Sequence, residues 1–348
     1  MKAAVLKEIE ELEIKEIPRP HPQKGEILLK VEACSICGTD VRVYHHGHKH
    51  IKFPIVTGHE VSGEIVELGE EIKGYRVGEE IAVAPAIPCG KCYYCRRGMP
   101  GMCLNLRAIG YNYNGGFAEY MIVPEIAIQN DCVNLIPENI SFEEAALAEP
   151  LACAINGQEL SKIGLGDSVL IIGAGPLGCI HLQLARANGA TKIMLMELSS
   201  YRINFARKFA EPDLIINPSL EDGIKRVKKE TSGRGVDKII VACPSGQAQE
   251  DSLKMIAPRG IVNFFGGLPK DKPYIRFDSN LVHYSEFYVV GTHGSAPYHN
   301  KLALNLISQG KIKVKELITH HLSLNQIKKG LHLAESQEGM KIVILPNQ

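Results

Sequence analysis

Four cysteines lie close together in the run PCGKCYYCRRGMPGMC. Cys89, Cys92, Cys95 and Cys103 follow the spacing C-x2-C-x2-C-x7-C. The CxxC turns bring pairs of sulfurs to a common centre and the longer loop delivers the fourth, which suits a tetrahedral zinc ion. The alternative, two disulfides, requires a secretory context that the sequence does not show. We therefore predict a structural zinc site in a lobe over residues 86–105.

Length and charge narrow the class of protein. The chain has 348 residues, which favours two domains, and Lys+Arg and Asp+Glu both number 39. A net charge of +0 argues against nucleic-acid and membrane-surface partners. No apolar run approaches the roughly 20 residues that span a bilayer. The N-terminus lacks the apolar core of a signal peptide, and 10 cysteines without export signals indicate a reducing compartment, so we expect a cytoplasmic protein.

The hydrophobic pattern changes near Glu143. Residues 1–150 show short strands between Gly and Pro turns, as in GEILLKVEAC and HEVSGEIVEL. Residues 151–290 alternate near-continuously apolar strands with helical segments, which is typical of a doubly wound parallel sheet. Residues 291–348 hold two further helices and a closing strand, KIVILP. The pattern predicts an α/β protein with a β-rich domain and a dinucleotide-binding domain.

The motif GAGPLG at 173–178 follows a predicted strand and opens a helix. Gly173 permits a tight turn, Gly175 lets the backbone approach a pyrophosphate, and Gly178 allows close helix–strand packing. Pro176 and Leu177 begin the helix whose N-terminus would face the phosphates. The alternative is a plain tight turn, which the surrounding strand–helix–strand unit disfavours.

Glu197 ends the next predicted strand, 19 residues after Gly178. A carboxylate there binds the ribose hydroxyls and repels a 2′-phosphate, so the sequence favours NAD over NADP. The alternative for Glu197 is a solvated strand end. Arg202 lies five residues further on and could serve a phosphate.

Three further segments carry residue types that bind metals. Cys37 lies in CSICGTD, His59 and Glu60 lie in TGHEVSG, and Glu149 lies in LAEPLAC. A catalytic zinc needs about three protein ligands and one open position. Taken singly, each residue has an ordinary structural explanation, because a lone cysteine is usually core and a lone His-Glu pair is usually structural.

These motifs, in this order, resemble the zinc-dependent medium-chain alcohol dehydrogenases over essentially the whole chain. The segment GGFAEYMIVP at 115–124 is also similar to the family pattern. The resemblance is strongest to the polyol branch, which includes sorbitol and threonine dehydrogenases. It implies a GroES-like catalytic domain, a Rossmann domain, NAD, two zinc ions per subunit, a small-molecule alcohol substrate, and a homotetramer or homodimer.

The resemblance also implies roles for the metal-binding candidates. Glu149 holds the position of the third zinc ligand, a cysteine in liver-type members. The implied set is Cys37, His59 and a carboxylate, either Glu60 or Glu149, with exchange between the two as substrate or water enters. We expect Cys37, His59 and Glu60 to bind the zinc, with Glu149 alternating or acting through the bound water.

Residues near Cys37 match the family's proton relay only in part. Thr39 occupies the position of the hydroxyl that carries the proton away. Asp40 resembles the carboxylate that orients His59, and its alternative is a helix-capping role. Arg42 stands where the family often has a relay histidine, and arginine does not release a proton near neutrality.

A run of four histidines follows: His45, His46, His48 and His50. It is typical of a solvated loop. One of these histidines could instead replace the missing relay station. Together with Arg42, the cluster could also recognise a phosphate on the substrate.

Candidate substrate residues are scattered along the chain. His293 falls where the sorbitol branch carries an arginine lining the cleft, and its alternative is packing. Tyr44 and Phe117 are further candidates for the pocket wall. Cys153, four residues after Glu149, is expected to touch the nicotinamide ring in a packing role.

The sequence analysis favours NAD- and zinc-dependent oxidation of a secondary alcohol, a polyol or sugar alcohol, to the ketone. The alternatives are an L-threonine 3-dehydrogenase or a dehydrogenase of phosphorylated polyols. A catalytically silent nucleotide-binding relative is disfavoured, because such branches lack the CGTD and GHE residues that this chain keeps.

Overall fold

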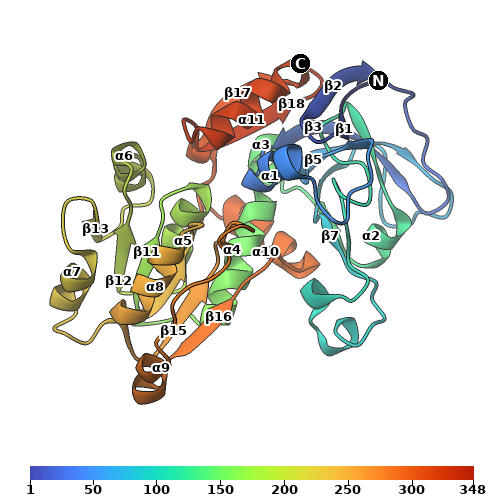
Figure 1. Cartoon of the computed structure of the whole chain (residues 1–348). Coiled ribbons are helices and arrows are strands. Elements are labelled where there is room, and N and C mark those ends of the chain that lie inside the picture. Colours follow the sequence, from blue (N-terminus) through green and yellow to red (C-terminus); the bar gives the residue numbers. More distant parts are fainter. The chain divides into compact units, whose positions relative to one another are not determined.

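The computed structural model describes residues 1–348 and divides into two compact units (Figure 1). The first unit combines Met1–Ala152 with Gly294–Gln348, and the second spans Cys153–His293. These divisions lie within three residues of the boundaries expected at 150 and 290. No helix has both the length and the apolar character needed to cross a membrane.

The first unit is built on a seven-stranded sheet that joins both ends of the chain (Figure 1). Its order is β10-β6-β5-β3-β18-β17, and β9 also pairs with β3. The strands are β3 (Ile27–Ser35), β5 (Glu60–Leu68), β6 (Glu80–Val83), β9 (Tyr120–Val123), β10 (Val133–Leu135), β17 (Ile318–Ser323) and β18 (Lys341–Leu345). Strand β18 is the closing strand that the sequence predicts, whereas β17 has a mixed polar pattern, ITHHLS, that does not predict a strand.

Two smaller sheets complete the strands of this unit. One contains β1 (Lys2–Glu8), β2 (Glu11–Glu16) and β4 (Ile55–Val56), and the other pairs β7 (Ala86–Ile87) with β8 (Arg107–Ala108). The β7–β8 pair closes the base of the cysteine-containing loop, because Ala86 lies opposite Ala108 and Ile87 opposite Arg107.

Short helices lie between these strands. They are α1 (Gly38–His46), α2 (Glu125–Gln129), α3 (Phe142–Ala146), α10 (Pro297–Ser308) and α11 (Ile327–Glu335), with the 3-10 turns η1 (Cys95–Arg97), η2 (Pro100–Met102), η3 (Lys315–Leu317) and η4 (Leu324–Gln326). Helix α4 (Ala148–Ser161) contains the boundary between the two units. Helix α1 begins directly after β3, so its N-terminus is held at the end of the longest buried strand of the sheet.

The second unit has a six-stranded, fully parallel sheet with the order β13-β12-β11-β14-β15-β16. The strands are β11 (Ser168–Ile172), β12 (Lys192–Met196), β13 (Leu214–Ile216), β14 (Val236–Val241), β15 (Ile256–Phe264) and β16 (Tyr288–Gly291). The order reverses at β11, which is the topology of dinucleotide-binding sheets. The doubly wound sheet predicted from the sequence is therefore present.

The helices of this unit are α5 (Pro176–Ala187), α6 (Ser200–Phe209), α7 (Gly223–Glu230), α8 (Gly246–Met255) and α9 (Ser279–Ser285). Four of them begin with a side chain that caps the first turn: Ser199 accepts from Arg202 N, Asp222 from Lys225 N, Ser245 from Ala248 N, and Asp278 from Asn280 N. Each cap satisfies a backbone N–H that the helix itself leaves unpaired.

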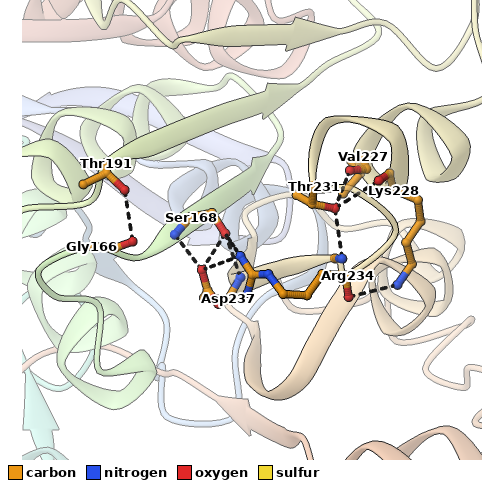
Figure 2. Close-up of polar contacts among 9 residues, drawn as sticks. Gly166, Ser168, Thr191, Val227, Lys228, Thr231, Arg234 and Asp237 are labelled. Atoms are coloured by element: carbon orange, nitrogen blue, oxygen red, sulfur yellow. Dashed lines mark hydrogen bonds and ion pairs between the residues drawn. The ribbon is translucent and has the colours of Figure 1, made fainter.

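A polar network ties the first residues of β11 and β14 together. Figure 2 shows Asp237 accepting hydrogen bonds from Ser168 N and Ser168 Oγ, at 2.9 and 2.6 Å. The Arg234 guanidinium pairs with the same carboxylate. Partial burial raises the pKa of Asp237, but Arg234 and Ser168 outweigh it and lower that pKa to about 2. The network anchors the end of the sheet at which these strands begin. Ligands in such folds bind at the opposite end, at the carboxyl ends of the strands.

We predict that Asp237→Asn lowers the free energy of unfolding by about 1–2 kcal/mol, because charge-assisted hydrogen bonds to Ser168 and Arg234 are weakened. Urea unfolding measures the change. Asp251→Asn is the matched control, since Asp251 has only exposed partners on its own helix, Lys254 and Gln247, and should change stability by less than about 0.5 kcal/mol. Equal stability of Asp237→Asn and the wild type would refute the anchoring role.

Candidate metal, cofactor and substrate sites

The four cysteines of the 86–105 lobe converge on one point. The sulfurs of Cys89, Cys92, Cys95 and Cys103 all lie within 4.8 Å of one another. The Sγ atoms of Cys92 and Cys95 are 3.5 Å apart, and those of Cys92 and Cys103 are 3.9 Å apart. A tetrahedral zinc with bonds of about 2.3 Å places its sulfurs about 3.8 Å apart. The geometry therefore fits one zinc ion with four thiolate ligands.

The backbone around the lobe favours ionised sulfur. The N–H groups of Cys95 and Leu104 lower the pKa of the Cys92 thiol to about 6. Cys103 also accepts N–H groups, from Cys89 at 3.2 Å and Asn105 at 3.3 Å, although burial raises its pKa to about 12. The Cys92 thiol is thus mostly ionised at neutral pH, whereas the Cys103 thiol stays protonated. Metal binding must therefore release protons.

A second group of metal-binding side chains lies in the interior of the first unit. The ligand atoms of Cys37, His59 and Glu60 lie within 4.8 Å of one another. Cys37 immediately precedes α1, while His59 and Glu60 lie at the beginning of β5. His59 is 7% exposed and Glu60 is 1% exposed. A half-buried thiol, a buried imidazole and a buried carboxylate are a donor set suited to zinc, which takes a fourth ligand.

Asp40 holds this group from the first turn of α1. Its Oδ2 accepts a hydrogen bond from Cys37 N at 2.9 Å, and its Oδ1 lies 3.4 Å from His59 Nδ1. Burial lowers the pKa of His59, but Asp40 and Cys37 outweigh it and raise that pKa well above the ordinary value. His59 Nδ1 has no hydrogen bond, so its polar partner is the charge of Asp40. Asp40 thus lies where a carboxylate can fix the imidazole of a metal ligand.

The glycine before His59 is required by close packing. Gly58 has φ = 94°, and a Cβ there would come within 2.8 Å of Cys34 Sγ and 2.9 Å of the Phe117 ring. Both the backbone conformation and the space exclude other residues. Phe117 is 0% exposed, so the structure places it in the hydrophobic core. This corrects the expectation that Phe117 lines the substrate pocket, because a GxF spacing alone does not distinguish a core ring from a pocket wall.

A buried ion pair, which the sequence analysis missed, engages Glu60. Lys341 Nζ and Ser35 Oγ both donate to Glu60 Oε2, and Lys341 Nζ also donates to Ile36 O at 3.1 Å. Burial lowers the pKa of Lys341, but Glu60 and Cys37 outweigh it and leave that pKa raised. One oxygen of Glu60 is therefore held by a cation and a hydroxyl, and Oε1 is the oxygen left for another partner.

Tyr111 and Glu149 lie near the same group. The Tyr111 ring centroid is 5.9 Å from that of His59. Burial raises the pKa of Tyr111 to about 12, with smaller effects from His59 and Glu149. Glu149, in the first turn of α4, also acts electrostatically on Lys341 but does not belong to the group of atoms within 4.8 Å.

The remaining candidates of the first unit lie on or after α1. Arg42 Nη2 donates to Thr39 Oγ1 at 2.9 Å, and Tyr44 OH donates to Glu10 O at 3.0 Å. His45 lies between two carboxylates, Glu10 and Glu335. The other histidines of the run diverge: His46 is exposed, whereas His48 and His50 lie near each other, with ring centroids 5.3 Å apart. The four histidines therefore do not form one site.

The glycine-rich turn of the second unit has the geometry that a dinucleotide needs. Gly173 has φ = 103°, and a Cβ at Gly178 would come within 1.9 Å of Gly173 O. Gly175 precedes α5, and a Cβ there would meet only Arg202, at 3.8 Å. Pro176 and Leu177 form the first turn of α5. The open approach at a helix N-terminus fits a pyrophosphate.

Glu197 is bound to this turn. Its Oε2 accepts from Ala174 N at 2.6 Å, and its Oε1 accepts from Leu198 N and Ser199 N at 2.8 Å each. Arg202 Nε is buried without a hydrogen-bond partner, so its guanidinium is available to an oxygen ligand. Cys153 and His293 also belong to this unit, and His293 is exposed.

The residues that the sequence analysis missed, Ser35, Tyr111 and Lys341, left weak signals. Lys341 opens the buried strand KIVIL, where a charged residue requires a partner. Ser35 ends a nine-residue buried strand, and Tyr111 lies in the turn GYNYNGG. None of these signals names the partner, because each partner lies far away in the sequence.

We predict that Cys95→Ser lowers the zinc content from two ions per chain to one and loosens the lobe, because three thiolates hold the metal less tightly than four. Elemental analysis measures the zinc, and limited proteolysis within residues 86–105 reports the loosening. Cys243→Ser, which lies outside both groups, should keep both ions. Full zinc content and unchanged proteolysis in Cys95→Ser would contradict the structural site.

We also predict that Lys341→Met destabilises the protein by about 3–5 kcal/mol, because it leaves the Glu60 carboxylate buried without its cation. The double variant Lys341→Met/Glu60→Gln should recover part of this loss, since no buried charge remains. Urea unfolding measures Lys341→Met, Glu60→Gln and the double variant against the wild type. Lys301→Met, on the exposed surface of α10, is the control. Additive effects of the two substitutions would show that the pair is not coupled.

Comparison with known proteins identifies the family of the chain. Residues 23–134 match the model of the alcohol dehydrogenase GroES-like domain, and residues 176–309 match that of the zinc-binding dehydrogenases. L-threonine 3-dehydrogenase of Pyrococcus furiosus is 36% identical over 338 residues, covering 96% of this chain and 94% of the relative. Sorbitol dehydrogenase of Bacillus subtilis is 30% identical over 359 residues, covering 100% and 98%. D-xylulose reductase A of Aspergillus oryzae is 33% identical, covering 94% and 92%.

Solved structures agree over the whole chain. A zinc-binding dehydrogenase from Sinorhizobium meliloti, bound to NADP, has a TM-score of 0.91 and 30% identity, covering 99% of both chains. Alcohol dehydrogenase TADH from Thermus sp. ATN1 has a TM-score of 0.90 and 28% identity, again covering 99% of both. The predicted fold class and the predicted dehydrogenase class are confirmed. The chain belongs to the zinc-dependent alcohol dehydrogenase family, in the polyol branch that its sorbitol, xylulose and threonine relatives represent.

Proposed function

We propose that this protein oxidises a secondary alcohol group of a polyol to the ketone, with NAD as the hydride acceptor and one catalytic zinc. The observation that carries the proposal is the convergence of Cys37, which is half-buried, with the buried His59 and Glu60. The four cysteines of the 86–105 lobe account for a structural zinc. The group of Cys37, His59 and Glu60 is therefore available for a catalytic zinc. When bound, zinc would supply Lewis-acid activation of the substrate hydroxyl, and the nicotinamide would supply the hydride acceptor.

The side chains around this group have separable duties. Cys37 and His59 bind the metal, and Asp40 keeps the His59 ring oriented. Thr39 Oγ1 accepts from Arg42, so its own hydroxyl hydrogen is free to exchange with the substrate proton. Because Arg42 cannot take that proton, the proton passes from Thr39 to water.

The third metal ligand is a carboxylate. Glu60 lies within reach, but Lys341 and Ser35 already occupy its Oε2. We propose that Glu60 binds through its remaining oxygen and that Glu149, close enough to act on Lys341 and Tyr111, alternates with it.

The NAD preference is proposed to come from Glu197. Three backbone N–H groups hold its carboxylate against the glycine-rich turn. A 2′-phosphate placed there would be repelled. The Sinorhizobium structure holds NADP. In this chain Arg202 supplies a cation near the glycine-rich turn. The proposed preference for NAD over NADP therefore depends on the Glu197 carboxylate rather than on the lack of a cation.

L-threonine is the second candidate substrate, because L-threonine 3-dehydrogenases of Pyrococcus reach 36–37% identity while the sorbitol dehydrogenases are 30% identical. We further propose that the protein acts in the cytoplasm, where its thiols stay reduced, and that it assembles as a homotetramer or homodimer. Analytical ultracentrifugation of the zinc-loaded protein tests the assembly.

The activity test uses NADH absorbance with sorbitol, xylitol, 2,3-butanediol, L-threonine and ethanol. Polyols should be oxidised faster than ethanol, because a neighbouring hydroxyl can complete the metal's coordination, and NAD should be used in preference to NADP. His59→Ala should abolish turnover while leaving NAD binding intact, and exposed His21→Ala should behave as the wild type. Ethanol oxidised faster than every polyol, or turnover in His59→Ala, would overturn the proposal. Turnover of L-threonine alone would select the second candidate.

A further inference from the structure

An open cavity of about 350 Å³ lies at the surface of the first unit, and most of the residues that line it are exposed. Six polar or aromatic side chains line it: His50, Lys52, Arg107, Tyr111, Asn112 and Asn114. They come from the segment between α1 and β4, and from β8 and the segment that follows it. None of the residues that line the cavity is an aspartate or a glutamate.

The cations of this cavity are not neutralised within the chain. Lys52 forms no salt bridge, and Arg107 forms none either. Arg107 Nη1 instead donates to Tyr113 OH at 3.2 Å, which positions the guanidinium without cancelling its charge. Two cations around one cavity attract an anion, and arginine matches planar or tetrahedral oxyanions with several N–H groups.

The two amides make the wall of the cavity rigid and add a donor. Asn112 Oδ1 accepts from Ala108 N at 3.0 Å, and its Nδ2 donates to His50 O at 3.4 Å, so it ties the two segments together. Asn114 Oδ1 accepts from Val56 N at 3.1 Å. With its oxygen engaged, Asn114 offers the cavity its amide N–H groups.

Tyr111 connects the cavity to the metal-binding group. Its ring lines the cavity and lies 5.9 Å, centroid to centroid, from the His59 ring. On another side the same ring lies 5.1 Å from the His48 ring. Tyr111 is thus the residue that the cavity and the surroundings of His59 share.

We propose that this cavity binds a phosphoryl group on the substrate, so that the protein acts on a phosphorylated polyol; this inference rests on the proposed alcohol oxidation. A phosphate dianion can use both cations and the amide together, whereas a carboxylate leaves part of this set unpaired. An amino acid is disfavoured, because its ammonium group would enter a cavity with cations and without a carboxylate. Arg42, the earlier candidate for phosphate binding, instead engages Thr39, and of the histidine run only His50 lines the cavity.

The first experiment measures binding without turnover. Inorganic phosphate is titrated into the zinc-loaded protein by isothermal titration calorimetry, and the wild type is compared with Lys52→Gln and Arg107→Gln. Each variant should weaken phosphate binding about tenfold, the effect of losing one charge-assisted hydrogen bond. Lys49→Gln is the control, because Lys49 is exposed in the same segment but does not line the cavity. Circular dichroism and zinc content confirm that the variants fold, and the two variants test the cavity independently.

The second experiment compares kcat/KM for sorbitol, sorbitol 6-phosphate and a sugar acid of similar length. The phosphate ester should be preferred over sorbitol by at least about tenfold, through KM. Lys52→Gln should remove that preference, whereas the control Lys49→Gln should keep both the preference and sorbitol oxidation as in the wild type. Equal use of sorbitol and its phosphate, or undiminished phosphate binding in both variants, would overturn the inference while leaving alcohol oxidation intact. Preference for the sugar acid would overturn the phosphoryl assignment. Oxidation of no alcohol would refute the proposed function, and the calorimetry would still decide whether the cavity binds phosphate.

Discussion

The buried pair between Glu60 and Lys341 is the interaction on which the rest of the first unit depends. Glu60 opens β5, Lys341 opens β18, and both reach the end of β3, which lies between them in the sheet. A buried carboxylate is tolerated there only because a cation and the Ser35 hydroxyl satisfy it. The pair therefore joins the C-terminal strand to the segment that carries His59.

The two metal-binding groups illustrate different ways of building a site. The four-cysteine lobe is local: its ligands lie within 15 consecutive residues, 89–103, and the β7–β8 pair closes its base. The buried group is assembled from the end of β3, the first turn of α1 and the start of β5, with Lys341 supplied from far along the chain. A local site can be recognised by spacing, whereas an assembled one depends on the register of the strands that hold it.

Charge distinguishes the two candidate anion-binding regions. At the glycine-rich turn, the Glu197 carboxylate lies among backbone N–H groups, and Arg202 is the nearby cation. In the cavity beside Tyr111, cations and an amide are present without any carboxylate. The first arrangement favours a ribose with free hydroxyls, and the second favours a substrate with a distal oxyanion. We propose on these grounds that the same chain rejects a phosphate on its cofactor and accepts one on its substrate.

The sequence by itself determined the elements whose signals are local. The cysteine spacing, the glycine-rich turn with Glu197, and the alternation of apolar strands with helices each depend on residues within one or two neighbouring elements. It also indicated Cys37, His59 and Glu60, through short motifs that resemble a known family. Only the tertiary structure decided that Lys341 and Ser35 hold Glu60, that Phe117 is core, and that Lys52, Arg107 and Tyr111 share a cavity. These partners meet because sheet pairing and loop packing bring distant segments together, and neither hydrophobic periodicity nor motif spacing specifies which distant side chains will face one another.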